Sequence, residues 1–186
     1  MSTPFVTTNR LFLRSITEAD EDAIYSYRSL EDVARFQYWE SFSREQIKLF
    51  ISRNKGAVPL TPEKWLGFAI VLKSSCKVIG DCAACIKKTS RKEDKSTPIF
   101  FLEIGCNVSP AYQNQGFARE ALAGLIAYYT THATIKEVCG LTDAENTASA
   151  RLMRSLGMTR VEGFERRIMC KGKVCVEHTY KKEIII

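Results

Sequence analysis

A short loop near the middle of the chain has the residue types of an anion-binding site. Residues 110–118 follow an apolar, strand-like run and precede a helical pattern that has a glycine, Gly116, at its start. Glycine allows a ligand to approach the backbone closely. A helix N-terminus adds unpaired N–H groups and the positive end of the helix dipole. Together these features predict a cradle for a phosphate group.

The spacing within this loop narrows the choice of phosphate ligand. The loop has neither the GxxxxGK pattern of the P-loop nor the GxGxxG pattern of dinucleotide-binding proteins. It fits Gln/Arg-x-x-Gly-x-Gly/Ala, with Gln113, Gly116 and Ala118 at the fixed positions. In this respect the chain resembles the GNAT family of acyl-CoA-dependent N-acetyltransferases, whose central motif binds the pyrophosphate of coenzyme A.

A second block, residues 146–158, supports the same resemblance. It is similar to the family's other coenzyme A segment, Asn-x-x-Ser-x-x-Leu-x-x-x-x-Gly-Phe, with Met158 in place of the aromatic residue. Its apolar residues share one helical stripe, and Gly157 suits a left-handed helix end. The resemblance covers most of residues 11–180 and is closest in character to the ribosomal-protein alanine acetyltransferases.

The resemblance implies how the donor, acetyl-CoA, is bound. Main-chain groups of Cys106 and Val108 are expected to pair with the pantetheine amides as an added strand would. The residues expected to hold the pyrophosphate through their N–H groups are Gln113, Asn114, Gln115, Gly116, Phe117, Ala118 and Arg119. Asn146 matches the asparagine that bonds the pantetheine, and it also suits a helix N-cap. No histidine is placed to activate Cys106, so this residue is interpreted as a buried strand cysteine.

Acyl transfer to an amine requires a base and benefits from an acid. Glu103, on the strand before the loop, is the predicted base, since glutamates here in similar enzymes order a water that relays the proton. The alternative is a strand carboxylate paired with a lysine. The tyrosine that serves as acid in many family members is replaced by Met153. Ser149 is the nearest substitute, although a serine within a helix also bonds its own backbone.

Composition disfavours several other classes of function. The net charge is +6, but the only dense basic patch, Lys87 to Lys95, lies among residues typical of a solvated loop and has no interleaved aromatic residues. We therefore favour a solvated loop over a nucleic-acid interface, and a basic nucleic-acid-binding module stays as the disfavoured third alternative, motivated by the net charge. Seven cysteines without a disulfide pattern indicate a reducing, cytoplasmic location. The pair Cys82 and Cys85 lacks the further ligands of a zinc site, so no metal is expected. No apolar run approaches the roughly 20 residues of a membrane span.

We expect a single domain over residues 1–186 with a mixed α/β (α+β) fold. Expected strands lie at residues 11–14, 65–72, 77–88, 99–108, 137–141, 160–169 and 174–184, and expected helices begin near residues 17, 43, 116 and 146. The resemblance implies a mostly antiparallel sheet, flanked by helices and splayed between the fourth and fifth of these strands.

The predicted activity is acetyl transfer from acetyl-CoA to a primary amine by direct attack in a ternary complex. Both a protein N-terminal α-amine and a small-molecule amine remain open as acceptors, as does a longer acyl-CoA as donor. A monomer and a homodimer are both compatible with the sequence. The alternative function is a non-catalytic acyl-CoA-binding regulator, suggested by the missing tyrosine.

Overall fold

The computed structural model describes residues 2–90 and 98–185. The described residues form nine strands and five α-helices. The strands are β1 (Val6–Thr7), β2 (Leu11–Ser15), β3 (Leu66–Leu72), β4 (Lys77–Ser90), β5 (Pro98–Val108), β6 (Glu137–Asp143), β7 (Thr159–Arg160), β8 (Arg166–Cys170) and β9 (Lys173–Glu183). The helices are α1 (Glu21–Arg28), α2 (Glu31–Ala34), α3 (Arg44–Asn54), α4 (Phe117–His132) and α5 (Thr147–Ser155), with 3₁₀ turns at Glu18–Asp20 and Pro110–Tyr112.

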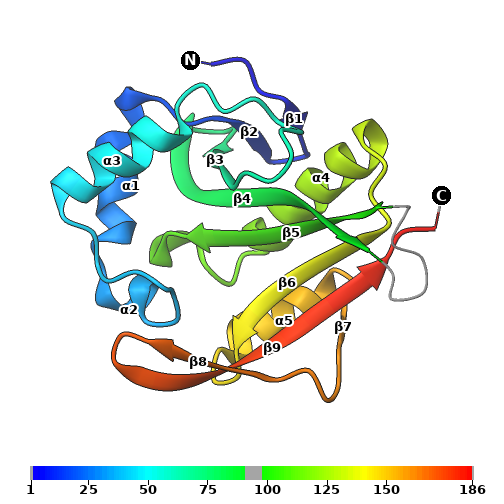
Figure 1. Cartoon of the computed structure of the whole chain (residues 1–186). Coiled ribbons are helices and arrows are strands. Elements are labelled where there is room, and N and C mark those ends of the chain that lie inside the picture. The colour runs from blue at the N-terminus through cyan, green and yellow to red at the C-terminus, as the bar shows by residue number, and fades with distance from the viewer. Residues whose placement is uncertain (1, 91–97, 186) are drawn as a thin grey trace.

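One sheet, in the order β1-β2-β3-β4-β5-β6-β9-β7, forms the middle layer of the molecule, and β8 pairs with β9 at its edge (Figure 1). Every neighbouring pair is antiparallel except β5 and β6. Helices α1 and α3 cover one side, which we call the α1 face, and α4 and α5 cover the other, the α4 face. This mixed, mostly antiparallel sheet flanked by helices confirms the predicted fold class.

Strand alternation divides the apolar side chains between the two faces. On β3, Phe68 and Ile70 join a large cluster with α4, whereas Ala69 and Val71 pack with Ile24 and other residues of α1 and α3. The sequence of β3 is apolar at nearly every position because both faces of the strand are covered.

The parallel contact between β5 and β6 is very short. Only the pairs Phe101–Glu137, Leu102–Val138 and Glu103–Cys139 are formed. Beyond Glu103 the two strands separate, while β5 stays paired with β4 and β6 stays paired with β9. The separation leaves a gap between residues 104–108 of β5 and residues 140–143 of β6. It lies between the fourth and fifth expected strands, as predicted.

Most expected elements are found, with three differences. The expected strand 160–169 is divided into β7 and β8, because the chain turns between them through Gly163 at φ +73°. The short strand β1 and the single-turn helix α2 were not predicted, since two and four residues are too few to show a periodicity. The basic patch is not wholly a solvated loop: Lys87 lies within β4, as the expected strand 77–88 requires, and it contacts Glu103. Residues 91, 92 and 95 lie outside the described residues.

A buried polar network joins α1 to β4. The carboxylate of Asp81, which is 2% exposed, accepts two hydrogen bonds from Arg28 (2.7 and 2.9 Å) and one from the hydroxyl of Tyr27 (2.7 Å). Asn107 of β5 donates to the same carboxylate at 3.3 Å. Because a buried charge is tolerated only when its hydrogen bonds are made, this network fixes α1 against the end of β5.

Tyr27→Phe should lower the free energy of unfolding by about 2 kcal/mol, because a buried carboxylate loses one of its donors. Tyr129→Phe is the matched control. Tyr129 is also buried, but its hydroxyl accepts only a 3.5 Å contact from the Leu60 N–H. Urea denaturation measures both variants, and equal losses would show that the contact with Asp81 adds nothing.

Candidate active site

The gap beside β5 is lined by main-chain groups that point into it. Ser109 N–H bonds the Ile79 carbonyl at 2.9 Å and continues the β4–β5 register, so the odd-numbered residues of β5 bond to β4. The even-numbered residues must then direct their N–H and C=O groups away from β4. The bond from Lys136 N–H to the Phe100 carbonyl, at 3.0 Å, agrees with this assignment. Cys106 and Val108 therefore face the gap with their peptide groups, as the proposed pantetheine contact requires.

The predicted phosphate loop connects the end of this gap to α4. Gly116 is the N-cap of α4 with φ +80°, a left-handed conformation that favours glycine. The bond from Glu120 N–H to the Gly116 carbonyl, at 3.0 Å, begins the helix. The N–H groups of the three residues between them have no partner within the helix and are therefore able to bind an anion. The loop thus fits the pyrophosphate that the sequence predicts.

Side chains of the loop support its shape. The Gln113 amide donates to the Val108 carbonyl at 2.9 Å, so this carbonyl is already occupied and only the Val108 N–H is free for a ligand. Gln115 donates to the Ala111 carbonyl at 3.1 Å. Arg119 reaches α5, where its Nε donates to the Ser155 carbonyl at 3.1 Å. The two helices expected to contact coenzyme A are thereby linked.

Arg10, from the turn between β1 and β2, was not predicted to lie at this site. Its Nη1 donates to the Gln115 carbonyl at 3.1 Å, and its guanidinium lies over the Phe117 ring at 4.3 Å. Glu120 holds it in place, accepting from its Nε at 2.6 Å and from its main-chain N–H at 2.7 Å. The contact with Gln115 spans 105 residues, and no local pattern in the sequence indicates such a contact.

The Arg10 contact orients one peptide group of the loop. In a trans peptide the C=O of Gln115 and the N–H of Gly116 point in opposite directions. By holding the carbonyl, Arg10 directs the Gly116 N–H to the other side of the loop. Arg10 Nη2 also lies 3.4 Å from the place that a Cβ of residue 116 would take, so it adds a positive charge at the glycine.

Arg10→Gln should therefore weaken coenzyme A binding by about 10-fold or more, the loss expected for a charge-assisted contact. Turnover of S-acetylpantetheine, which lacks the pyrophosphate, should be unchanged. Calorimetry with coenzyme A and steady-state kinetics with both donors measure the difference. An equal loss with both donors would show that Arg10 only stabilises the fold.

Glu103 lies on the α1 face at the point where β5 and β6 separate. It is 8% exposed, and its Oε2 forms a short ion pair with Lys87. Partial burial acts to lower the pKa of Lys87, but the hydrogen bond and charge of Glu103 outweigh it and raise the pKa. Lys87 is thus a cation, and the lysine pairing considered from the sequence is present. On the same face nothing lies within 4 Å of the place that a Cβ at Gly105 would take, which leaves open space beside Glu103.

Ser149 and Asn146 lie on the opposite side of the sheet, in the first turn of α5. The Asn146 side chain accepts from the Ser149 N–H at 3.0 Å, so it caps the helix. The Ser149 hydroxyl has no hydrogen bond to any described residue and does not bond its own helix. Met153, at the position of the family tyrosine, is 3% exposed and packs against Gly140. The structure therefore does not bring Glu103 and Ser149 together on one face of the sheet.

The thiols near the gap are poor nucleophiles. Burial raises the pKa of Cys106 to about 12, and burial with the nearby Glu103 raises that of Cys139 to about 12. Neither thiol ionises at neutral pH. The interpretation of Cys106 as a buried strand cysteine is met only in part, because Cys106 lies on β5 but is half-buried. Among the described residues, no three His, Cys, Asp or Glu side chains are grouped as metal ligands. In the same part of the chain, no helix is long and apolar enough to cross a membrane.

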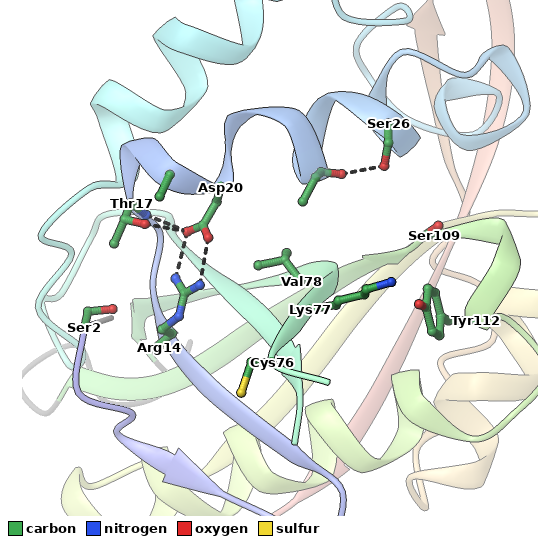
Figure 2. Close-up of a pocket in the computed structure, with 12 residues that line it drawn as sticks. Ser2, Arg14, Thr17, Asp20, Ser26, Cys76, Lys77, Val78, Ser109 and Tyr112 are labelled. Carbon is green, nitrogen blue, oxygen red and sulfur yellow. Dashed lines mark hydrogen bonds and ion pairs between the residues drawn. The ribbon is translucent and has the colours of Figure 1, made fainter. Parts of the chain in front are cut away.

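A cavity of about 700 Å³ lies at the far end of the α1 face (Figure 2). Arg14 and Asp20 form one wall through two hydrogen bonds of 2.7 Å, and Ser109 and Tyr112 lie on the opposite side. None of the residues predicted to bind the donor or to catalyse transfer lines this cavity. Two of its lining residues, Ser109 and Tyr112, lie in the connection between β5 and α4.

A family model for the acetyltransferase (GNAT) domain matches residues 10–159. The chain belongs to the GNAT family. The uncharacterized N-acetyltransferase YnaD of Bacillus subtilis is 30% identical over 167 residues, which cover 90% of this chain and 89% of YnaD. These matches show that the protein is an N-acetyltransferase.

Solved structures of acetyltransferases share the fold. A GNAT-family acetyltransferase from Bacillus anthracis has a TM-score of 0.79 at 24% identity and covers 96% of this acetyltransferase and 97% of its own chain. RimL, a ribosomal-protein acetyltransferase in complex with coenzyme A, has a TM-score of 0.75 at 17% identity, with 98% of each chain covered. Spermidine N-acetyltransferase from Vibrio cholerae, in complex with coenzyme A and spermine, has a TM-score of 0.70 at 13% identity, covering 94% and 95%.

Proposed function

We propose that this acetyltransferase uses acetyl-CoA as donor, bound along the gap, and acetylates a primary amine that arrives from the α1 face. The observation that carries the proposal is the arrangement around β5. Peptide groups of Cys106 and Val108 point into the gap, the gap leads to the N–H groups of the Gly116 loop, and Glu103 stands where the gap closes. The peptide groups of β5 fit the pantetheine of acetyl-CoA, the Gly116 loop fits its pyrophosphate, and Glu103 lies near the end that carries the acetyl group.

Donor and acceptor then meet from opposite sides of the sheet. When bound, acetyl-CoA supplies an acetyl group whose bond to sulfur breaks as the new bond to the amine nitrogen forms. Glu103 takes the amine proton, directly or through a water, since a protonated amine has no electron pair for attack. A main-chain N–H facing the gap stabilises the charge that develops on the carbonyl oxygen. Ser149 returns a proton to the departing sulfur from the α4 face.

A thiol-release screen tests the proposed function. Acetyl-CoA and a longer acyl-CoA are offered with peptides beginning in Ala, Ser or Met, with polyamines and with aminoglycosides. We expect release of free thiol with at least one acceptor and no release without protein. Tight coenzyme A binding without turnover of any acceptor would contradict the proposal and support the regulator considered from the sequence.

A further inference from the structure

Glu177 of β9 is a buried carboxylate whose hydrogen bonds are incomplete. It is 4% exposed, and its Oε1 accepts from the hydroxyl of Tyr38. Its Oε2 is buried and has no hydrogen-bond partner among the described residues. The nearest cation, Arg166 Nε, is 3.9 Å from Oε2, beyond hydrogen-bond length. A buried charge with a free acceptor position is costly and requires an explanation.

Strand registers place this carboxylate on the α1 face, across the gap from Glu103. Glu103 pairs with Cys139 of β6, and Asp143, four residues further along β6, pairs with Glu177. Residues two or four apart on a strand, and direct cross-strand partners, share a face. Glu103 and Glu177 therefore lie on opposite sides of the gap and on the same face of the sheet.

Tyr38 extends over this region from the segment that follows α2. Burial raises the pKa of its hydroxyl, the hydrogen bond and charge of Glu177 raise it further, and the charge of Glu103 contributes in the same direction. The hydroxyl thus lies within the field of both carboxylates. The Tyr38 O–H donates a hydrogen bond to Glu177. An N–H group of a ligand can replace this O–H as the donor.

The cover over Glu177 is removable. Tyr38 is 65% exposed, and the side chain of Arg166 is 58% exposed. The segment carrying Tyr38 is joined to the β8–β9 turn by polar contacts, from Lys171 Nζ to the Ala34 carbonyl at 2.6 Å and from Cys170 Sγ to the Gln37 carbonyl at 3.5 Å. Exposed side chains and polar contacts exchange readily with water and ligands.

Charge favours a cationic ligand in this place. Glu103, Asp143 and Glu177 share the face, with Lys87 on Glu103 and Arg166 near Glu177. Lys181 of the same face is paired with Glu137 at 2.8 Å. We propose that Glu177 binds a second cationic nitrogen of the acceptor while Glu103 serves the nitrogen that is acetylated. This inference rests on the proposed function. The acceptor is then a small amine with at least two cationic nitrogens rather than an acidic peptide.

The test compares straight-chain diamines with monoamines of the same chain length. The wild-type protein should favour diamines by about 10-fold or more in kcat/KM, the effect of one added charged contact. Glu177→Gln should remove this preference and leave monoamine turnover and the Kd for coenzyme A unchanged. Glu183→Gln, an exposed glutamate on the same strand, is the matched control and should keep the preference.

Two further measurements keep the inference distinct from the proposed function. Calorimetric titration of the coenzyme A complex with a diamine tests the Glu177 contact even without turnover, and binding should weaken about 10-fold in Glu177→Gln. Tyr38→Phe removes the competing hydroxyl and should not weaken diamine binding. Equal use of diamines and monoamines by the wild type, or equal diamine binding by wild type and Glu177→Gln, would overturn the inference while leaving acetyl transfer to monoamines intact.

Discussion

Gly116→Glu is expected to reduce coenzyme A affinity by about 1000-fold and to abolish acetyl transfer at ordinary donor concentrations. The substitution places a carboxylate at the loop that holds the pyrophosphate, and like charges in contact cost several kcal/mol. It also forces a side chain into the left-handed conformation at φ +80°, which costs about 1–2 kcal/mol. Calorimetry with coenzyme A measures the affinity directly.

Backbone strain and charge repulsion can be separated with a matched variant. Gly163 has φ +73°, nothing lies within 4 Å of a Cβ placed there, and it lies in the turn between β7 and β8, away from α4. Gly163→Glu should lose similar stability and keep full coenzyme A affinity. If both variants bound coenzyme A like the wild type, the Gly116 loop would not be the pyrophosphate site.

Glu103→Gln should lower kcat by about 100-fold or more, the contribution of a positioned general base. Glutamine keeps the size of the side chain and still accepts a hydrogen bond from Lys87, so the KM for acetyl-CoA should change little. The loss should shrink as the pH rises, because a larger fraction of the amine is then already unprotonated. Steady-state rates at saturating acetyl-CoA provide the measurement.

Lys87→Met distinguishes catalysis from a structural ion pair. This variant removes the partner of Glu103 and keeps the carboxylate, and we expect it to retain kcat within about 10-fold of the wild type. If Glu103 serves only the ion pair, the two variants should lose equal stability and show the same activity. Urea denaturation alongside the kinetics decides between these outcomes.

Features that depend on neighbouring residues could be predicted from the sequence. The glycine loop before α4 and the helix start near residue 43 are confirmed, because each is defined within a few residues. The structure shows a capping box of Ser43 and Gln46 at that helix start. The N-cap role of Asn146, considered as an alternative, is likewise observed. The residues assigned to donor binding and catalysis stay predictions, although the loop and the gap have the shapes that these roles require.

Contacts between distant segments could not be predicted in this way. Arg10 contacts the carbonyl of Gln115, which lies 105 residues away along the chain. Tyr38 contacts the carboxylate of Glu177, which lies 139 residues away. A single side chain carries no signal for such a partner, whereas the periodicity of a helix or strand repeats over many residues. For the same reason the sequence indicated a lysine for Glu103 without identifying Lys87.

Under the proposed function, the short contact between β5 and β6 couples the stability of the molecule to its donor. With three residue pairs formed, the two parts of the sheet have few hydrogen bonds of their own at this boundary. A ligand lying in the gap supplies the main-chain partners that a strand would give, and it binds only the folded chain. By mass action, a coenzyme A concentration 100 times its Kd adds about 2.7 kcal/mol to the free energy of unfolding. Under the proposed function, the free energy of unfolding therefore rises with the concentration of the donor.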